Sequence, residues 1–232
     1  MIRFSLFGVP VSIQPAVLLM LGLLGWGLVE ETAPLWLCVA LFSVAGFVCL
    51  LSHEMGHAIV GRMLGGGHPR VVVSWLGGDC CNADGVFTRM QGVIMTAAGP
   101  LFTLLNAGAA ALYLCWLCGD VQEGAQLAYS AIFGCVPPVY FEVYSPAKIL
   151  FAGYMVQIGF WWAVLNLLPI FPLDGGQMMH GLMVSPRRMH LISLVVALCG
   201  VVISLALGFW LMAVFLVLLA YLNYRCLWYT SH

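Results

Sequence analysis

The chain has 232 residues, of which 63% are hydrophobic and 7% are charged. A mean hydropathy of +1.04 is typical of an integral membrane protein and excludes an ordinary soluble globular domain. The net charge of −1 gives no indication of a nucleic-acid partner, and we expect none.

Six apolar stretches follow one another along the chain, and each is close to or longer than the ~20 residues that a helix needs to cross the hydrocarbon core. Pro15 lies near the start of the first stretch, and three glycines from Gly65 end the second. We expect no cleaved signal peptide, because hydrophobic segments continue from the first stretch to the C-terminus. The stretches cover residues 11–29, 34–64, 92–118, 148–168, 189–207 and 209–227. The sequence therefore predicts an all-α polytopic membrane protein with about six transmembrane helices, in which residues 1–232 form one membrane-embedded domain.

The connection between the second and third stretches has the pattern of β-structure. Val71-Val72-Val73 and Val86-Phe87-Thr88 resemble strands, and the glycines, asparagine and aspartates between them indicate turns. We expect a small β-structure at the membrane surface, with strands within residues 70–75 and 86–88. Two interpretations stay open: an ordered connector, or an exposed strand edge that pairs with an extended substrate segment.

Basic residues are distributed asymmetrically about the six stretches. If the N-terminus is cytoplasmic, Lys148 alone falls on the outer side. The seven arginines then all fall on the cytoplasmic side: Arg3, Arg62, Arg70, Arg89, Arg187, Arg188 and Arg225. Because this agrees with the positive-inside rule, we expect a multi-pass protein with both termini in the cytoplasm. From the compact single-domain build and the arginine asymmetry we expect its membrane to be a bacterial inner membrane, and an organelle membrane, which would give the same asymmetry, stays open.

The second stretch contains the ionisable sequence His53-Glu54-Met55-Gly56-His57 within an apolar run. Ionisable groups inside a spanning segment are costly and usually functional. On a helix, residues four apart project from one face, so His53 and His57 can reach the same metal ion. Glu54 lies about 100° around the helix from His53, close enough to contact a water on that metal. This is the HExxH arrangement of zinc hydrolases.

Two histidines are too few ligands, because a catalytic zinc usually has three protein ligands and a water. The end of the fourth stretch offers a third in Asp174, which follows Pro169 and Pro172. Two prolines prevent a regular helix, and irregular backbone at membrane depth is tolerated where it is buried in protein or lines a cavity. We expect this broken segment to turn Asp174 back toward the two histidines.

The two segments together, HEMGH at residues 53–57 and NLLPIFPLDG at residues 166–175, resemble the paired HExxH and NxxPxPxLDG motifs of the site-2 protease family of intramembrane zinc metalloproteases. The resemblance implies a three-helix catalytic core over about residues 34–176. It also implies that His53, His57 and Asp174 bind one Zn²⁺ ion, that Glu54 is the catalytic base, and that Asn166 holds the substrate backbone or the oxyanion.

One position departs from the family pattern. After Gly99-Pro100 the family often has an asparagine where this chain has Thr103, and the nearest asparagine is Asn106. The PDZ and CBS accessory domains that are common in the family have no counterpart in the sequence.

The resulting functional prediction is regulated intramembrane proteolysis of a transmembrane protein substrate within the lipid bilayer, near its cytoplasmic side. A regulatory membrane partner is compatible with this function. His68, His180 and His190 lie in or near the expected loops, and we interpret them as surface or interfacial residues. The nine cysteines form no framework, and we interpret them as small buried hydrophobes.

Other classes of function stay open. The chain fits a catalytically inactive, metal-binding membrane scaffold, or a metal transporter in which His53, His57 and Asp174 form a transit site. A membrane HExxH protease of the type that trims prenylated proteins takes a downstream glutamate as its third ligand, and no glutamate follows Glu142 in this chain.

Overall fold

The computed structural model describes residues 1–26, 33–74, 77–183 and 185–229. They separate into two compact units, and α3 and α6 each contribute to both. The first unit comprises residues 1–86 and 98–163, and the second comprises residues 87–97 and 164–232. Five of the described helices are long and apolar enough to cross a membrane: α2 (Leu35–Gly65), α3 (Arg89–Cys118), α6 (Pro146–Leu167), α8 (Pro186–Ala206) and α9 (Trp210–Tyr229). This confirms a mainly helical, multi-pass membrane fold with a small sheet.

The first of the six expected spans is a shorter helix in the described residues. α1 covers Ala16–Trp26, and the residues before it form strand β2 (Val9–Ile13) instead of a helix. Val9, Val11 and Ile13 are buried while Pro10 is exposed, which is the two-residue period of a strand. The end that we expected for this span, at Val29, lies outside the described residues.

Four strands form one sheet at the end of α2 that carries Arg62. β1 (Ile2–Leu6) pairs antiparallel with β2, β2 pairs parallel with β3 (Arg70–Ser74), and β3 pairs antiparallel with β4 (Gly77–Cys81). The predicted strand near residues 70–75 is confirmed over Arg70–Ser74, although Trp75 lies outside the described residues. The predicted strand at residues 86–88 is wrong, because the partner of β3 is the glycine-rich segment that we interpreted as a turn.

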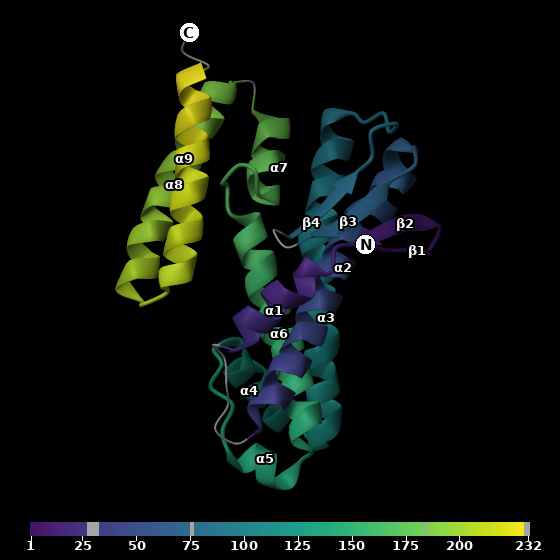
Figure 1. Ribbon diagram of the computed structural model, residues 1–232, viewed down its shortest axis with the longest axis vertical. Helices are drawn as coiled ribbons and strands as arrows, with labels where there is room; N and C mark the ends of the chain where they lie inside the picture. Colours follow the sequence, from purple (N-terminus) through teal and green to yellow (C-terminus); the bar gives the residue numbers. More distant parts are fainter. Residues whose placement is uncertain (27–32, 75–76, 184, 230–232) are drawn as a thin grey trace. The chain divides into compact units, whose positions relative to one another are not determined.

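The first unit is a bundle with the sheet at one end and two short helices at the other, α4 (Val121–Ile132) and α5 (Val139–Val143) (Figure 1). Asp120 caps α4 by accepting a hydrogen bond from the backbone N–H of Glu123 at 2.7 Å. Leu114, Leu127 and Ile149 are fully buried in the core that α3, α4 and α6 share. A separate apolar cluster, which includes Val11, Val71 and Met55, joins the sheet to α1 and α2.

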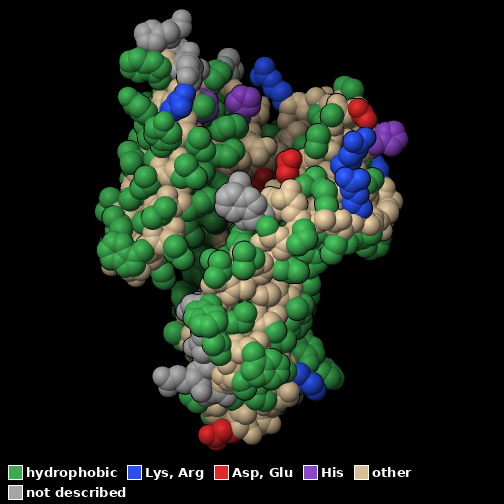
Figure 2. Space-filling model, in the orientation of Figure 1, with side chains coloured by type: hydrophobic (Ala, Val, Ile, Leu, Met, Phe, Trp, Pro, Cys, Tyr) green, Lys and Arg blue, Asp and Glu red, His purple; other side chains and the backbone are tan. Residues whose placement is uncertain are grey.

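The second unit contains the break after α6, the short helix α7 (Asp174–Leu182) and the hairpin of α8 and α9. The Phe171–Pro172 peptide bond is cis. Ile170 is fully buried and packs against apolar residues of α8 and α9. Figure 2 shows that hydrophobic side chains cover most of the visible face of this hairpin, as a membrane-facing surface requires.

Candidate metal centre

The HEMGH segment lies within α2 and is buried on all sides. Every residue from His53 to Ala58 is buried, so protein surrounds this part of the helix. Gly56 makes the packing possible, because a Cβ at this position would lie 2.6 Å from the carbonyl oxygen of Ala98 on α3. Gly56, which lies between the two histidines of the segment, thus allows close packing of α2 against α3.

The two histidines face each other one turn apart. Their Nε2 atoms are 3.3 Å apart, and their rings meet edge to face with centroids separated by 4.8 Å. The same nitrogen of each ring therefore points to one place, as a shared ion requires.

Thr103 on α3 orients the first of these rings. The Nδ1 atom of His53 lies 3.0 Å from the Thr103 hydroxyl, which donates its own proton to the Gly99 carbonyl at 3.0 Å. Because that proton is used, the hydroxyl accepts from Nδ1–H of His53. Nε2 then carries the lone pair with which an imidazole binds a metal. Sequence reasoning compared Thr103 with the family's asparagine but did not predict this contact.

Gly99 also leaves room for the second ring. A Cβ at Gly99 would collide with Nε2 and Cε1 of His57. A glycine at this position therefore lets α3 pass directly beside the histidine pair.

Asp174 is the first residue of α7, directly after the broken segment, and it is buried. The structure brings it together with the histidines: one ligand atom from each of His53, His57 and Asp174 lies within 4.8 Å of the others. These are the three residues that the sequence indicated, although their assignment as metal ligands stays a prediction.

The donor chemistry of this group fits zinc. Two imidazole nitrogens and one carboxylate oxygen form the ligand set of several catalytic zinc sites, which keep a fourth position for water. All three residues are buried, so an ion here would be desolvated, and the negative charge of the aspartate would offset part of its positive charge. A soft copper site or an all-oxygen magnesium site needs other donors.

Glu54 is buried beside the histidine pair and lies against strand β4. A Cβ at Gly78 would collide with Cγ, Cδ and Oε1 of Glu54, so the β4 backbone passes directly against this carboxylate. The sequence did not predict this contact, because Gly77 and Gly78 have the composition of a turn.

The two asparagines occupy different places. Asn166 is half-buried in the last turn of α6, and its role toward a substrate stays a prediction. Asn106 donates a hydrogen bond to Ser52 on α2. It is therefore Thr103 that contacts His53, and Asn106 packs one turn further along α3.

The other histidines differ from one another. His68 and His180 are exposed, in agreement with the sequence interpretation. The interpretation of His190 as a surface residue is wrong, because His190 is buried in α8 and its Nδ1 lies 2.9 Å from Oδ1 of Asn223. The sequence did contain an indication of a buried polar contact here, because Ser193 and Asn223 are polar residues within apolar spans.

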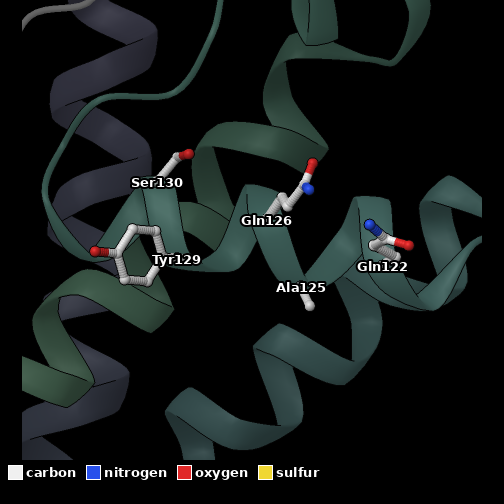
Figure 3. Close-up of a pocket in the computed structure, with 5 residues that line it drawn as sticks. All are labelled: Gln122, Ala125, Gln126, Tyr129 and Ser130. Carbon is white, nitrogen blue, oxygen red and sulfur yellow. The ribbon is translucent and has the colours of Figure 1, made fainter.

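Two hollows have linings that include none of the three residues His53, His57 and Asp174. One of about 480 Å³ lies on α4 and is lined by Gln122, Ala125, Gln126, Tyr129 and Ser130 (Figure 3). The other, of about 510 Å³, lies between α3 and α6, with Asn106 and Lys148 among its lining residues. The linings offer amide, hydroxyl and ammonium groups and none of the histidine, cysteine or carboxylate side chains that bind zinc.

Comparison with known proteins finds similarity in sequence and in fold. The chain is 28% identical over 183 residues to "Putative zinc metalloprotease Rip3" of Mycobacterium tuberculosis, in two strains; the match covers 75% of this chain and 41% of the relatives' length. In fold it resembles the site-2 protease from Methanocaldococcus jannaschii, with a TM-score of 0.55 and 16% identity over 97% of this chain and 94% of that one. No family model matches the chain.

Proposed function

We propose that this chain is a member of the site-2 protease family, an intramembrane zinc metalloprotease that cleaves a transmembrane protein substrate. One observation supports the proposal most directly: the buried ligand atoms of His53, His57 and Asp174 lie within 4.8 Å of one another. The relatives share 28% identity and are more than twice as long as the matched part, so the activity itself is our inference.

His53, His57 and Asp174 would hold the zinc. The ion, when bound, supplies Lewis acidity, which makes a water molecule more acidic and polarises a peptide carbonyl. Thr103 keeps the ring of His53 in the tautomer that leaves Nε2 available.

Glu54 is the residue that moves the proton. Its carboxylate accepts a proton from the water as the water oxygen forms a bond to the peptide carbon. The same carboxyl group then gives the proton to the departing amine nitrogen as the C–N bond breaks. Burial of Glu54 keeps bulk water from this exchange.

We assign Asn166 to the substrate. Its side-chain amide would donate a hydrogen bond to the substrate backbone or to the developing oxyanion, because an amide N–H is a suitable donor for either. Strand β4 has a related role: it is the terminal strand of the four-stranded sheet and touches Glu54 through Gly78. An extended substrate segment that adds to this edge would pass the base.

The length of α2 suggests where cleavage occurs. Its 31 residues span ~46 Å, whereas the hydrocarbon core is ~30 Å thick, so the helix extends beyond the core. His57 lies eight residues before the end of α2, and Arg62 lies between His57 and that end. Together with the arginine distribution, this supports our proposal that the reaction occurs near the cytoplasmic side of a bacterial inner membrane and that both termini are in the cytoplasm.

The substrate follows from this depth. A peptide bond reaches a buried site inside the bilayer only if it belongs to a membrane-spanning segment. A helical segment must unwind locally, because helical carbonyls are already hydrogen-bonded. A regulatory membrane partner that controls access is compatible with this requirement.

The decisive experiment replaces Glu54 by glutamine in the purified full-length chain. We expect E54Q to keep one zinc ion per chain but to lose cleavage of a transmembrane test substrate by about 100- to 10,000-fold, the usual effect of removing a general base. E142Q is the matched control, because Glu142 is exposed on α5.

Each alternative predicts another result. A transporter moves metal across proteoliposomes with Glu54 replaced, and a scaffold binds zinc but cleaves nothing in the wild type. Wild-type cleavage by E54Q refutes the catalytic assignment.

A further inference from the structure

The hairpin of α8 and α9 holds a buried polar cluster in an otherwise apolar surface. Ser193 and Asn223 are fully buried and His190 is 8% exposed. Neighbouring residues of the same helices are exposed and apolar, as expected of a lipid-facing hairpin, for example Val202, Leu211 and Val214. Polar side chains in this setting are costly unless they satisfy a partner, so their partner is informative.

That partner is the backbone of Phe171. The Phe171 N–H donates to the Ser193 hydroxyl at 3.1 Å, and the Asn223 amide nitrogen donates to the Phe171 carbonyl at 2.6 Å. The second proton of this amide nitrogen goes to the Leu219 carbonyl at 2.9 Å. Both backbone groups of Phe171 are therefore satisfied by side chains of the hairpin.

His190 completes the arrangement. Because the amide nitrogen of Asn223 uses both of its protons, Oδ1 acts as acceptor, and Nδ1–H of His190 donates to it at 2.9 Å. The His190 ring also meets the Phe171 ring edge to face, with centroids 5.5 Å apart. These contacts fix which way the Asn223 amide points.

The segment after α6 needs such support. Pro169 and Pro172 have no backbone N–H, and the chain between Leu167 and Asp174 is not helical, so its polar groups lack helical partners. Short turns supply some bonds, such as Leu173 N–H to the Ile170 carbonyl at 2.8 Å. The Phe171 groups are supplied from the hairpin instead.

Movement of Phe171 is coupled to Asp174 by close packing. A Cβ on Gly175 would collide with the carbonyls of Leu167 and Leu168, and one on Gly176 would collide with the backbone of Ile170 and Phe171. The broken segment thus lies directly on the first turn of α7, which begins at Asp174. A shift of one requires a shift of the other.

We propose that His190, Ser193 and Asn223 are positioning residues: they hold the Phe171 backbone and thereby fix Asp174 in the geometry that binds zinc. This inference rests on the proposed function. It adds residues of α8 and α9 to those that support the catalytic core, which the sequence placed within about residues 34–176. The cluster acts through Asp174 and does not touch the reacting atoms.

The test uses S193A and N223L in the full-length chain, with S204A as the control. Ser204 is also buried in α8, so S204A is the same change on the same helix without the bond to Phe171. Zinc affinity is measured by competition with a chelator in detergent. We expect a 10- to 100-fold loss for N223L and a smaller loss for S193A, as for other residues that orient metal ligands, with S204A within about two-fold of wild type.

A second measurement separates positioning from general destabilisation and from failure of the proposed function. Hydrogen exchange of the amides from Ile170 to Gly175 in metal-free protein should be at least about ten-fold faster in both variants, while the melting temperature of the metal-free chain stays close to that of S204A. Unchanged exchange and unchanged zinc affinity overturn the inference. A wild type that binds no zinc overturns the proposed function, whereas exchange still decides whether the cluster holds the segment.

Discussion

The Nδ1 atom of His53 and the hydroxyl of Thr103 lie 3.0 Å apart, and the hydroxyl's own proton is donated to the carbonyl of Gly99. This chain of two hydrogen bonds joins one turn of α3 to the HEMGH segment of α2. It is entirely buried, since Thr103 is 0% exposed. The tautomer of His53 is thus determined by its hydrogen bond to Thr103 on α3.

Replacing Thr103 by valine removes the acceptor while keeping the side-chain shape. We expect T103V to lower zinc affinity by about 10- to 100-fold, because the ring can then rotate or change tautomer. T103S keeps the hydroxyl and should retain affinity within a few-fold. T96V is the matched control, since Thr96 is a buried threonine on the same helix. Equal zinc affinity in T103V and the wild type would contradict this role.

Replacing Gly78 by alanine places a methyl group where the Glu54 carboxylate lies. The carboxylate must move, and a displacement of about 1 Å at a catalytic group can cost on the order of 100-fold in rate. We expect G78A to lose cleavage by roughly this factor while zinc content stays unchanged, because the methyl group meets Glu54. D79A is the control, since Asp79 is the next residue of β4 and is exposed. Full cleavage by G78A would show that Glu54 does not act from this position.

Replacing Gly99 by alanine should affect zinc binding through His57, and not the proposed base Glu54. The added methyl group would meet Nε2 and Cε1 of His57. We expect G99A to bind zinc at least about ten-fold more weakly. Gly108 also lies in α3 but has open space around it, so G108A should bind zinc normally and be stabilised by up to ~1 kcal/mol. Zinc titration followed by thermal melting distinguishes the two variants, and normal zinc binding by G99A would exclude the contact.

Much of the fold was predictable because membrane-spanning helices impose a strong local pattern. The predicted second span, residues 34–64, differs from α2 by one residue at each end. The first span was predicted wrongly at its start, because an apolar strand that precedes an apolar helix reads as one continuous run. The residues of β2 alternate in burial only once the sheet exists.

The site was predictable where its residues carry unusual chemistry for their surroundings. His53, His57 and Asp174 are ionisable groups near or within apolar spans, and the structure brings them together. Their partners were not predictable, because a threonine such as Thr103 is unremarkable in a helix. The bond between His190 and Asn223 joins residues 33 positions apart, which no helical period reveals. Gly78 was missed because a strand that must approach a carboxylate closely has the glycine composition of a turn.

Two adjacent cysteines in β4 give a pH-dependent test of the environment next to Glu54. Burial raises the pKa of the Cys80 thiol to about 12, and the negative charge of Glu54 adds to this effect. Cys81 is exposed. Because the thiolate is the reactive form, we expect alkylation at pH 8 to modify Cys81 at least about 100-fold faster than Cys80, and Cys80 to react appreciably only as the pH rises toward 12.

Removing the charge of Glu54 should change the pKa of Cys80 in a known direction, because burial and Glu54 both raise it. Since burial is the larger cause and Glu54 the smaller, E54Q should lower the pKa of Cys80 only slightly and raise its alkylation rate by a few-fold. Peptide mapping of the alkylated wild type, E54Q and C81S measures each thiol separately. If Cys80 in the wild type reacts as fast as Cys81 at pH 8, then β4 does not pack against α2 as described. The contact between Gly78 and Glu54 would then be refuted as well.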